Sequence, residues 1–127
     1  MKLLLDTHTF LWFIEDSPQL SANVKNLLES DVDLLISAAS LWEIAIKTSI
    51  GKLTLTQPFD AFIPDQLRKN AIDLLPIAVS HLALVSTLPL QHRDPFDRIL
   101  VAQAIIEQLP IVSIDDKLDL YGVKRVW

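Results

Sequence analysis

Short apolar runs alternate along the chain with longer segments in which apolar residues recur at helical spacing. The runs are Lys2–Leu5, Leu34–Ile36, Ile72–Leu75 and Ile111–Ile114, and residues 123–126 indicate a final edge strand. Runs of this length are typical of strands covered on both faces in a parallel sheet. Because helical segments separate them, the pattern predicts an α/β fold with a central, mostly parallel sheet of about four to five strands and helices on both faces.

Capping residues and helix breakers set the expected helix boundaries. Ser21 caps a helix that runs to about residue 30, Ser80 caps a short helix to about residue 87, and Gly51 ends the helix that contains Leu41–Lys47. A further helix extends over about residues 59–70, where Pro64 indicates a kink or a late start. The sequence has no repeat, linker or low-complexity segment, so we expect residues 1–127 to form one domain.

The most informative stretch is His92–Arg98, which leads into a helix that is apolar on nearly every face and ends before Pro110. A helix with that pattern is expected to be buried on more than one side. Asp94 fits the N-cap and Pro95 the first helical position, and Asp97 follows at the third, near the positive end of the helix dipole. These residues also make a good helix start with no chemical role, so a functional interpretation depends on other carboxylates reaching the same place.

Three further acids are expected at the same edge of the sheet. Asp6 ends the first strand, Asp115 ends the fourth, and Glu43 lies in the first turn of the helix after the second strand. In a parallel sheet, strand ends and helix starts share one edge, and ligands bind there. These three acids can therefore meet Asp97.

Each acid also has an ordinary interpretation. Asp6 and the pair Asp115-Asp116 fit solvated turns, and Glu43 completes a capping box with Ser40. If the acids do gather, they raise one another's pKa and repel unless a cation lies between them. Carboxylate oxygens suit hard cations, so we expect Mg²⁺ or Mn²⁺ rather than zinc.

The composition excludes several kinds of functional site. The 127-residue chain has no cysteine, which excludes disulfides and thiolate metal sites, and its two glycines are too few for glycine-rich nucleotide loops. The net charge of −5 argues against a nucleic-acid partner unless bound cations reverse the local field. No segment reaches the roughly 20 apolar residues of a membrane span and no leader is visible, so we expect a cytoplasmic protein without a membrane partner.

An all-carboxylate metal site suits the hydrolysis of phosphodiesters, because a divalent cation activates water and stabilises the charge that builds on phosphorus. The three histidines, His8, His81 and His92, are scattered, and we interpret each as a surface or core residue. No Ser/His/Asp or Cys/His arrangement is evident. We therefore expect direct attack by water, without a covalent intermediate.

Four segments carry a resemblance to a known family: Leu3–His8, Ser40–Lys47, His92–Arg98 and Val112–Asp115. They span nearly the whole chain, and their order and spacing are similar to those of PIN-domain ribonucleases, specifically the VapC-type toxins of prokaryotic toxin–antitoxin pairs. The resemblance implies a single PIN-like domain and a metal-dependent endoribonuclease. It also implies that the catalytic, metal-binding residues are Asp6, Glu43, Asp97 and Asp115.

The resemblance leaves other positions near the site open. Ser113 occupies a position where the family often has a hydroxyl. Asp94 is either a ligand or only a cap, and Asp116 competes with Asp115 for the terminal role. Arg93 and Arg98 flank the acids, where each could contact RNA phosphate or pair with a neighbouring acid.

The resemblance also implies partners: an RNA substrate, a second copy of the chain in a homodimer, and a small antitoxin whose tail occupies the active-site groove. Trp12, Phe13, Phe59 and Phe62 offer an aromatic surface for such a partner, although packing inside the core is the favoured interpretation of these residues.

Two other classes of function are compatible with a small acidic α/β domain. A phospho-acceptor signalling module needs an acidic pair after the first strand and an acceptor aspartate after the middle strand, whereas here the third strand ends in Leu75-Pro76. A PIN-fold binding protein without catalytic activity is the other alternative. A phosphatase is disfavoured, because Asp6-Thr7-His8 lacks the second aspartate of a D-x-D motif.

Overall fold

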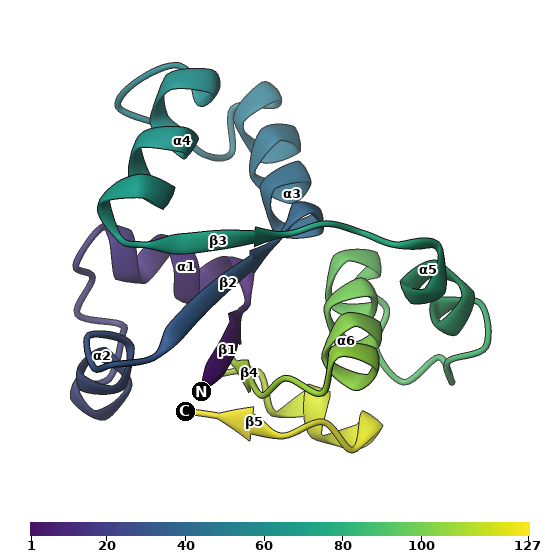
Figure 1. The fold of residues 1–127 in the computed structure, drawn as a ribbon. Helices are drawn as coiled ribbons and strands as arrows, with labels where there is room; N and C mark the ends of the chain where they lie inside the picture. The colour runs from purple at the N-terminus through teal and green to yellow at the C-terminus, as the bar shows by residue number, and fades with distance from the viewer.

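A single sheet of five parallel strands organises the protein, which we describe from a computed structural model covering residues 1–127. The strand order is β3-β2-β1-β4-β5 (Figure 1). The strands are β1 (Lys2–Leu5), β2 (Asp33–Ser37), β3 (Ile72–Leu75), β4 (Ile111–Val112) and β5 (Arg125–Val126). The predicted α/β fold with a parallel sheet is therefore confirmed.

Six α-helices and one 3₁₀ helix surround this sheet. They are α1 (Thr7–Ile14), α2 (Ala22–Leu28), α3 (Ala38–Ser49), α4 (Phe59–Lys69), α5 (Val79–Val85), α6 (Pro95–Glu107) and η1 (Asp116–Tyr121). The predicted caps at Ser21 and Asp94 are confirmed, and Gly51 follows α3 with a positive φ of 76°. The helix α4 continues through Pro64. None of the helices is long and apolar enough to cross a bilayer.

Two predicted helix starts are wrong. The helix α3 begins at Ala38, because the Ser37 hydroxyl accepts a hydrogen bond from the Ala39 N–H at 3.0 Å. Ser40 therefore lies inside the helix, its buried hydroxyl has no hydrogen-bond partner, and no capping box with Glu43 forms. The helix α5 starts after Ala78 instead of Ser80, and the His81 ring accepts a hydrogen bond from the Ala78 N–H at 2.9 Å.

The last two strands are shorter than predicted. The apolar run continues to Ile114, but the Ser113 hydroxyl accepts a hydrogen bond from the Asp115 N–H at 3.0 Å and turns the chain away from β4. Asp115 then caps η1, which replaces the short turn expected there. Gly122, with a positive φ of 75°, ends η1 and delays the start of β5 to Arg125.

The central strand β1 separates two apolar cores. Leu3 and Leu5 pack on one face with residues of α1, α2, α3 and α4, and Leu4 packs on the other face with Leu100 and Val101 of α6. Alternate side chains of a strand point to opposite faces, so one apolar strand serves both layers. The aromatic residues considered as a partner surface, Trp12, Phe13, Phe59 and Phe62, are partly buried against the first core.

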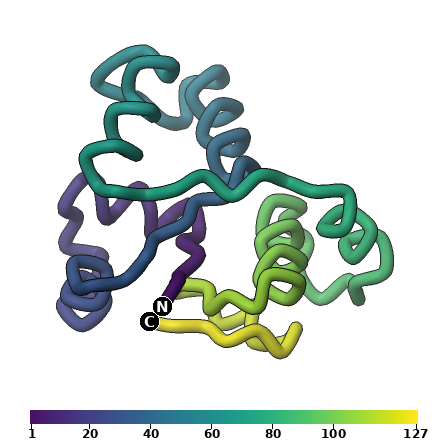
Figure 2. The backbone as a smooth tube through the Cα atoms, in the orientation of Figure 1, coloured from purple at the N-terminus to yellow at the C-terminus, as the bar shows by residue number.

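The strand order creates a switch point beside β1. The chain winds from β1 to β2 and β3, crosses by α5 and α6, and returns to β4 on the other side of β1, as the tube in Figure 2 makes visible. In open α/β sheets, ligands bind outside the carboxyl ends of the strands at such a point. The acids that follow β1 and β4 are therefore brought to the same crevice.

Candidate metal centre

Asp6 lies at the carboxyl end of β1 and caps the next helix. Its Oδ1 accepts a hydrogen bond from the Thr9 N–H at 2.8 Å, and the residue is only 5% exposed. The Thr9 hydroxyl donates to the Val112 carbonyl at 2.9 Å, which ties the start of α1 to the end of β4. The carboxylate is thus fixed at the switch point by local backbone geometry.

Glu43 reaches the same crevice from the second turn of α3. Its Oε1 accepts a hydrogen bond from the Thr7 hydroxyl at 2.7 Å, and its Oε2 lies 2.9 Å from Lys47 Nζ. The residue is 7% exposed, and a buried carboxylate requires partners of this kind. The sequence identified Glu43, but its position in the first turn was wrong, because α3 begins earlier than predicted.

Asp97 lies in the first turn of α6, next to the cap residue Asp94. Asp94 Oδ1 accepts hydrogen bonds from the N–H groups of Phe96 and Asp97 at 2.8 and 3.3 Å. The pKa of Asp97 is raised to about 7, first by burial and then by the charges of Asp94, Asp6 and Glu43, which His92 partly offsets. Burial is the largest cause, and the smaller contributions of Asp94, Asp6 and Glu43 indicate that these acids lie near Asp97.

Asp115 reaches the crevice from the end of β4. Its Oδ1 accepts from the Lys117 N–H at 3.0 Å, and its Oδ2 lies 2.8 Å from His92 Nε2. Burial raises the pKa of Asp115, but the hydrogen bonds from His92 and Lys117 outweigh it, so the pKa is lowered. Ser113 is fully buried and orients the Asp115 backbone, whereas Asp116 is exposed and lies outside the crevice.

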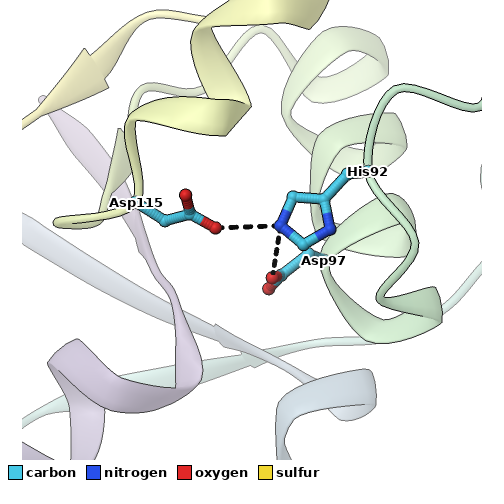
Figure 3. Close-up of side chains that lie close together, drawn as sticks. All are labelled: His92, Asp97 and Asp115. Carbon is cyan, nitrogen blue, oxygen red and sulfur yellow. Dashed lines mark hydrogen bonds and ion pairs between the residues drawn. The ribbon is translucent and has the colours of Figure 1, made fainter.

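The four predicted acids line one cavity of about 230 Å³. Its walls are formed by Asp6, Thr7, His8, Glu43, His92, Asp94, Asp97, Ile114 and Asp115. The tightest group within it consists of His92, Asp97 and Asp115, whose nearest ligand atoms all lie within 4.8 Å of one another (Figure 3). Asp6 and Glu43 line the same cavity but are outside this group, since hydrogen bonds hold them toward the first turn of α1 and toward Lys47.

The sequence places His92 beside the acids but favours a surface or core residue, so its contacts with two carboxylates were not predicted. Its Nε2 lies 2.8 Å from Asp115 Oδ2 and 3.2 Å from Asp97 Oδ2, and its side chain is 11% exposed. The two carboxylates come from α6 and from the end of β4 and meet at a single ring nitrogen (Figure 3). The signals in the sequence are that His92 opens the segment His92–Arg98 and lies two residues before the cap residue Asp94.

The two arginines near the site have different surroundings. The Arg98 guanidinium donates to the carbonyl oxygens of Val85, Leu88 and Pro89 at 2.9 to 3.3 Å. It is therefore engaged with the loop between α5 and α6 and does not face the cavity. Arg93 is exposed, forms no ion pair, and lines a groove beside the cavity.

That groove has a volume of about 450 Å³ and shares Glu43 and Asp94 with the cavity. Three cationic residues line it: Lys47, Lys52 and Arg93. Phe96 also lines it and forms an edge-to-face contact with exposed Trp42, with ring centroids 5.2 Å apart. The groove therefore combines positive charge and an aromatic surface next to the acids.

The residues of the cavity fit a hard divalent cation. The donor set consists of carboxylate oxygens, which Mg²⁺ and Mn²⁺ prefer. Burial and then the charges of Asp94, Asp6 and Glu43 raise the pKa of Asp97, and a cation placed among these acids would offset both effects. Asp6, Glu43, Asp97 and Asp115 are the residues that could hold such an ion.

Comparisons with known proteins agree with this arrangement. Residues 3–124 match the PIN domain family. Ribonuclease VapC22 of Mycobacterium tuberculosis is 28% identical over 119 residues, which are 91% of this chain and 88% of that protein. Ribonuclease VapC16 of the same organism is 35% identical over 71 residues, which are 52% of this chain and 50% of that protein.

Solved structures share the fold. VapBC2 from Rickettsia felis, bound to a DNA fragment from its promoter, matches with a TM-score of 0.73 at 16% identity, covering 99% of this chain and 98% of that chain. DNA-bound VapBC from Salmonella typhimurium matches with a TM-score of 0.71 at 16% identity, covering 99% of this chain and 97% of that chain. Because the match to the family spans nearly the whole chain, the protein belongs to the PIN domain family.

Proposed function

We propose that this protein is a metal-dependent endoribonuclease that hydrolyses RNA phosphodiester bonds, acting as the toxin of a toxin–antitoxin pair. The observation that carries the proposal is the meeting of four carboxylates, from separate parts of the chain, in one cavity at the switch point of the sheet. Membership of the PIN family and the similarity to two VapC ribonucleases support it. In this proposal, residues 1–127 act as one PIN-like domain.

The cofactor in this proposal is Mg²⁺ or Mn²⁺, held by Asp6, Glu43, Asp97 and Asp115. When bound, a divalent ion of this kind activates water and offsets the charge that develops on phosphorus. Thr7 and Lys47 orient Glu43 by contacting its two oxygens. The pKa of Asp97 is raised to about 7, so Asp97 is only partly ionised near neutral pH, and a bound cation would favour its ionised form.

The groove beside the cavity is the proposed path of the RNA strand. A protein with a net charge of −5 repels phosphate over most of its surface, so a local group of cations is needed to attract it. Lys52 and Arg93 supply that group, and Lys47, which is paired with Glu43, lies beside them. Phe96 and Trp42 offer aromatic faces on which single-stranded bases can stack. Arg93 is the residue that we propose for a phosphate contact.

The remaining partners are proposed from the family. The similar solved structures are named as VapBC complexes, which supports a small antitoxin as partner. A homodimer and a location in the cytoplasm also belong to this proposal.

Cleavage of a labelled RNA by the Asp6→Asn variant tests the proposal. Asparagine is as good an N-cap as aspartate, so α1 stays intact while one anionic ligand is lost. We expect cleavage to fall by more than about 100-fold, because a ligand should matter at least as much as the groups that orient it. EDTA should abolish wild-type cleavage, and added Mg²⁺ or Mn²⁺ should restore it.

The matched control is Asp116→Asn, which removes the same charge from an exposed position outside the cavity. It should cleave like the wild type. Full activity of Asp6→Asn would refute the mechanism. A wild-type protein that binds Mn²⁺ but cleaves no RNA would favour the alternative of an inactive PIN-fold binding protein.

A further inference from the structure

His92 forms a bridge inside the cavity that none of the acids can form. Its Nδ1 accepts a hydrogen bond from the Asp94 N–H at 3.1 Å, while its Nε2 faces Asp115 Oδ2 at 2.8 Å and Asp97 Oδ2 at 3.2 Å (Figure 3). One side of the ring therefore holds the start of α6, and the other side faces the two carboxylates.

The hydrogen bond at Nδ1 determines where the ring carries its proton. A nitrogen that accepts an N–H bond must keep its lone pair, so in the neutral ring the proton lies on Nε2. Nε2–H then donates to Asp115 Oδ2, lies 3.2 Å from Asp97 Oδ2, and has no lone pair to offer a cation. His92 differs in this respect from a histidine ligand, whose coordinating nitrogen is unprotonated.

The backbone that carries His92 is held firmly from two sides. The Tyr121 hydroxyl accepts from the N–H groups of Gln91 and His92 at 3.1 and 2.8 Å and donates to the Pro89 carbonyl at 2.9 Å. Arg98 donates to carbonyls of the same loop. Both residues lie outside the cavity, and their contacts fix the loop that presents the imidazole ring.

Asp115 shows what the bridge does to a carboxylate. Its Oδ1 is held by the Lys117 N–H and its Oδ2 by His92 Nε2, so its orientation is set before any ligand binds. Two carboxylates from different elements repel each other, and the His92 N–H, which is bonded to Asp115 and close to Asp97, offsets part of that repulsion. Groups of this kind, which orient the ligands of a metal, influence affinity strongly.

We propose that His92 is a positioning residue: its Nε2–H holds the Asp97 and Asp115 carboxylates at the spacing that a divalent cation requires, without itself binding the cation. The inference deepens the proposed function and rests on it, since it assumes that these acids bind the ion.

Two variants of the full-length protein test the position of the donor. In His92→Gln the side-chain amide reaches the place of Nε2 and keeps an N–H donor there. In His92→Asn the shorter amide reaches only the place of Nδ1, so it keeps an acceptor for the Asp94 N–H but loses the bridge. Mn²⁺ binding is measured by calorimetry in the absence of RNA, and folding is checked by thermal unfolding.

We expect His92→Asn to weaken Mn²⁺ binding about 10- to 100-fold, as for other groups that orient metal ligands, and His92→Gln to recover affinity to within about threefold of the wild type. In wild-type protein, pulsed electron paramagnetic resonance of bound Mn²⁺ should detect no directly coordinated nitrogen. This last measurement needs no variant, so the inference stays open to refutation even if His92→Asn fails to fold.

Each of three results would overturn this inference but leave the proposed function intact. They are an unchanged Mn²⁺ affinity in folded His92→Asn, an Mn²⁺ affinity of His92→Gln as low as that of His92→Asn, and a directly coordinated nitrogen in the wild type. A wild-type protein that binds no Mn²⁺ would overturn the proposed function and this inference with it. The two failures are therefore distinguishable.

Discussion

Two histidines of this protein make nearly the same local contacts in different places. His81 Nδ1 accepts from the Ala78 N–H at 2.9 Å, and its Nε2 lies 3.0 Å from Glu107 Oε2. His92 Nδ1 accepts from the Asp94 N–H at 3.1 Å, and its Nε2 lies 2.8 Å from Asp115 Oδ2. Each ring caps the start of a helix and joins it to a distant carboxylate.

The two histidines differ in the carboxylates that their Nε2 atoms contact. His81 connects α5 to α6, and its single partner Glu107 is 41% exposed, so that carboxylate is largely hydrated. His92 contacts two carboxylates and lines a cavity with further acids behind them. The capping contact is therefore a structural device, and a chemical role arises only where the ring meets several acids that repel one another.

The largest expected effect is a gain in stability when the buried charge of Asp97 is removed by Asp97→Asn. The pKa of Asp97 rises from 3.8 in the unfolded chain to about 7 in the folded protein, mainly because of burial. The folded protein therefore holds an extra proton between these values, and its free energy of unfolding falls as the pH rises through about 7. At pH 8 the cost has a ceiling of about 4 kcal/mol, and partial hydration reduces the expected gain of the variant to about 2 to 4 kcal/mol.

Urea denaturation without metal, at pH 4 and pH 8, measures this effect. The free energy of unfolding of Asp97→Asn should exceed that of the wild type least at pH 4 and most at pH 8. Mn²⁺ should stabilise the wild type more than the variant. An advantage of equal size at both pH values would mean that packing, and not the charge of Asp97, causes it.

The second effect concerns His81, the histidine that lies outside the cavity. His81→Ala leaves the Ala78 N–H without its acceptor and opens space between α5 and α6, so we expect a loss of about 2 kcal/mol in the free energy of unfolding. Mn²⁺ affinity should stay within twofold of the wild type, because Glu107 does not line the cavity. If His81→Ala weakened Mn²⁺ binding as strongly as His92→Asn, the distinction between the two regions would be wrong.

Periodicity was sufficient to predict the fold and the gathering of the acids. The apolar runs identified the first three strands, and Asp6 follows its strand directly. The position of Asp97 in the first turn of α6 could be predicted, because Asp94 and Pro95 strongly indicate where this helix starts. Since parallel strands end at one edge, these positions determine where the carboxylates lie without knowledge of any side-chain contact.

The contacts within the cavity were beyond the reach of pattern analysis. Ser37 and Ser40 are both good caps, and only the backbone geometry decides that α3 starts at the first of them. Arg98 could contact phosphate by its position in the sequence, but the carbonyls of Val85, Leu88 and Pro89, just before its own helix, engage it. His92 acquires its partners through the fold, because Asp115 is 23 residues away in the chain.

The smallest expected effect comes from Tyr121, because the backbones of the two histidines are held in different ways. His81 lies within helix α5, whereas His92 lies in a loop that depends on the Tyr121 hydroxyl. Tyr121→Phe removes one hydroxyl that serves Pro89, Gln91 and His92, so we expect a stability loss of about 1 kcal/mol. Mn²⁺ affinity should fall about threefold, at the lower end of what orienting groups contribute, because the His92 ring is less firmly presented to Asp97 and Asp115.

The same substitution in the His92→Asn background gives the decisive comparison. If Tyr121 acts through the His92 ring, it should have no further effect on Mn²⁺ affinity once the bridge is absent, while its stability cost should persist, since the loop contacts are the same in both backgrounds. An equal loss of Mn²⁺ affinity in both backgrounds would mean that Tyr121 influences the cavity by another route. The position of His92 would then be determined by its own contacts with Asp94, Asp97 and Asp115, as that of His81 is determined by Ala78 and Glu107.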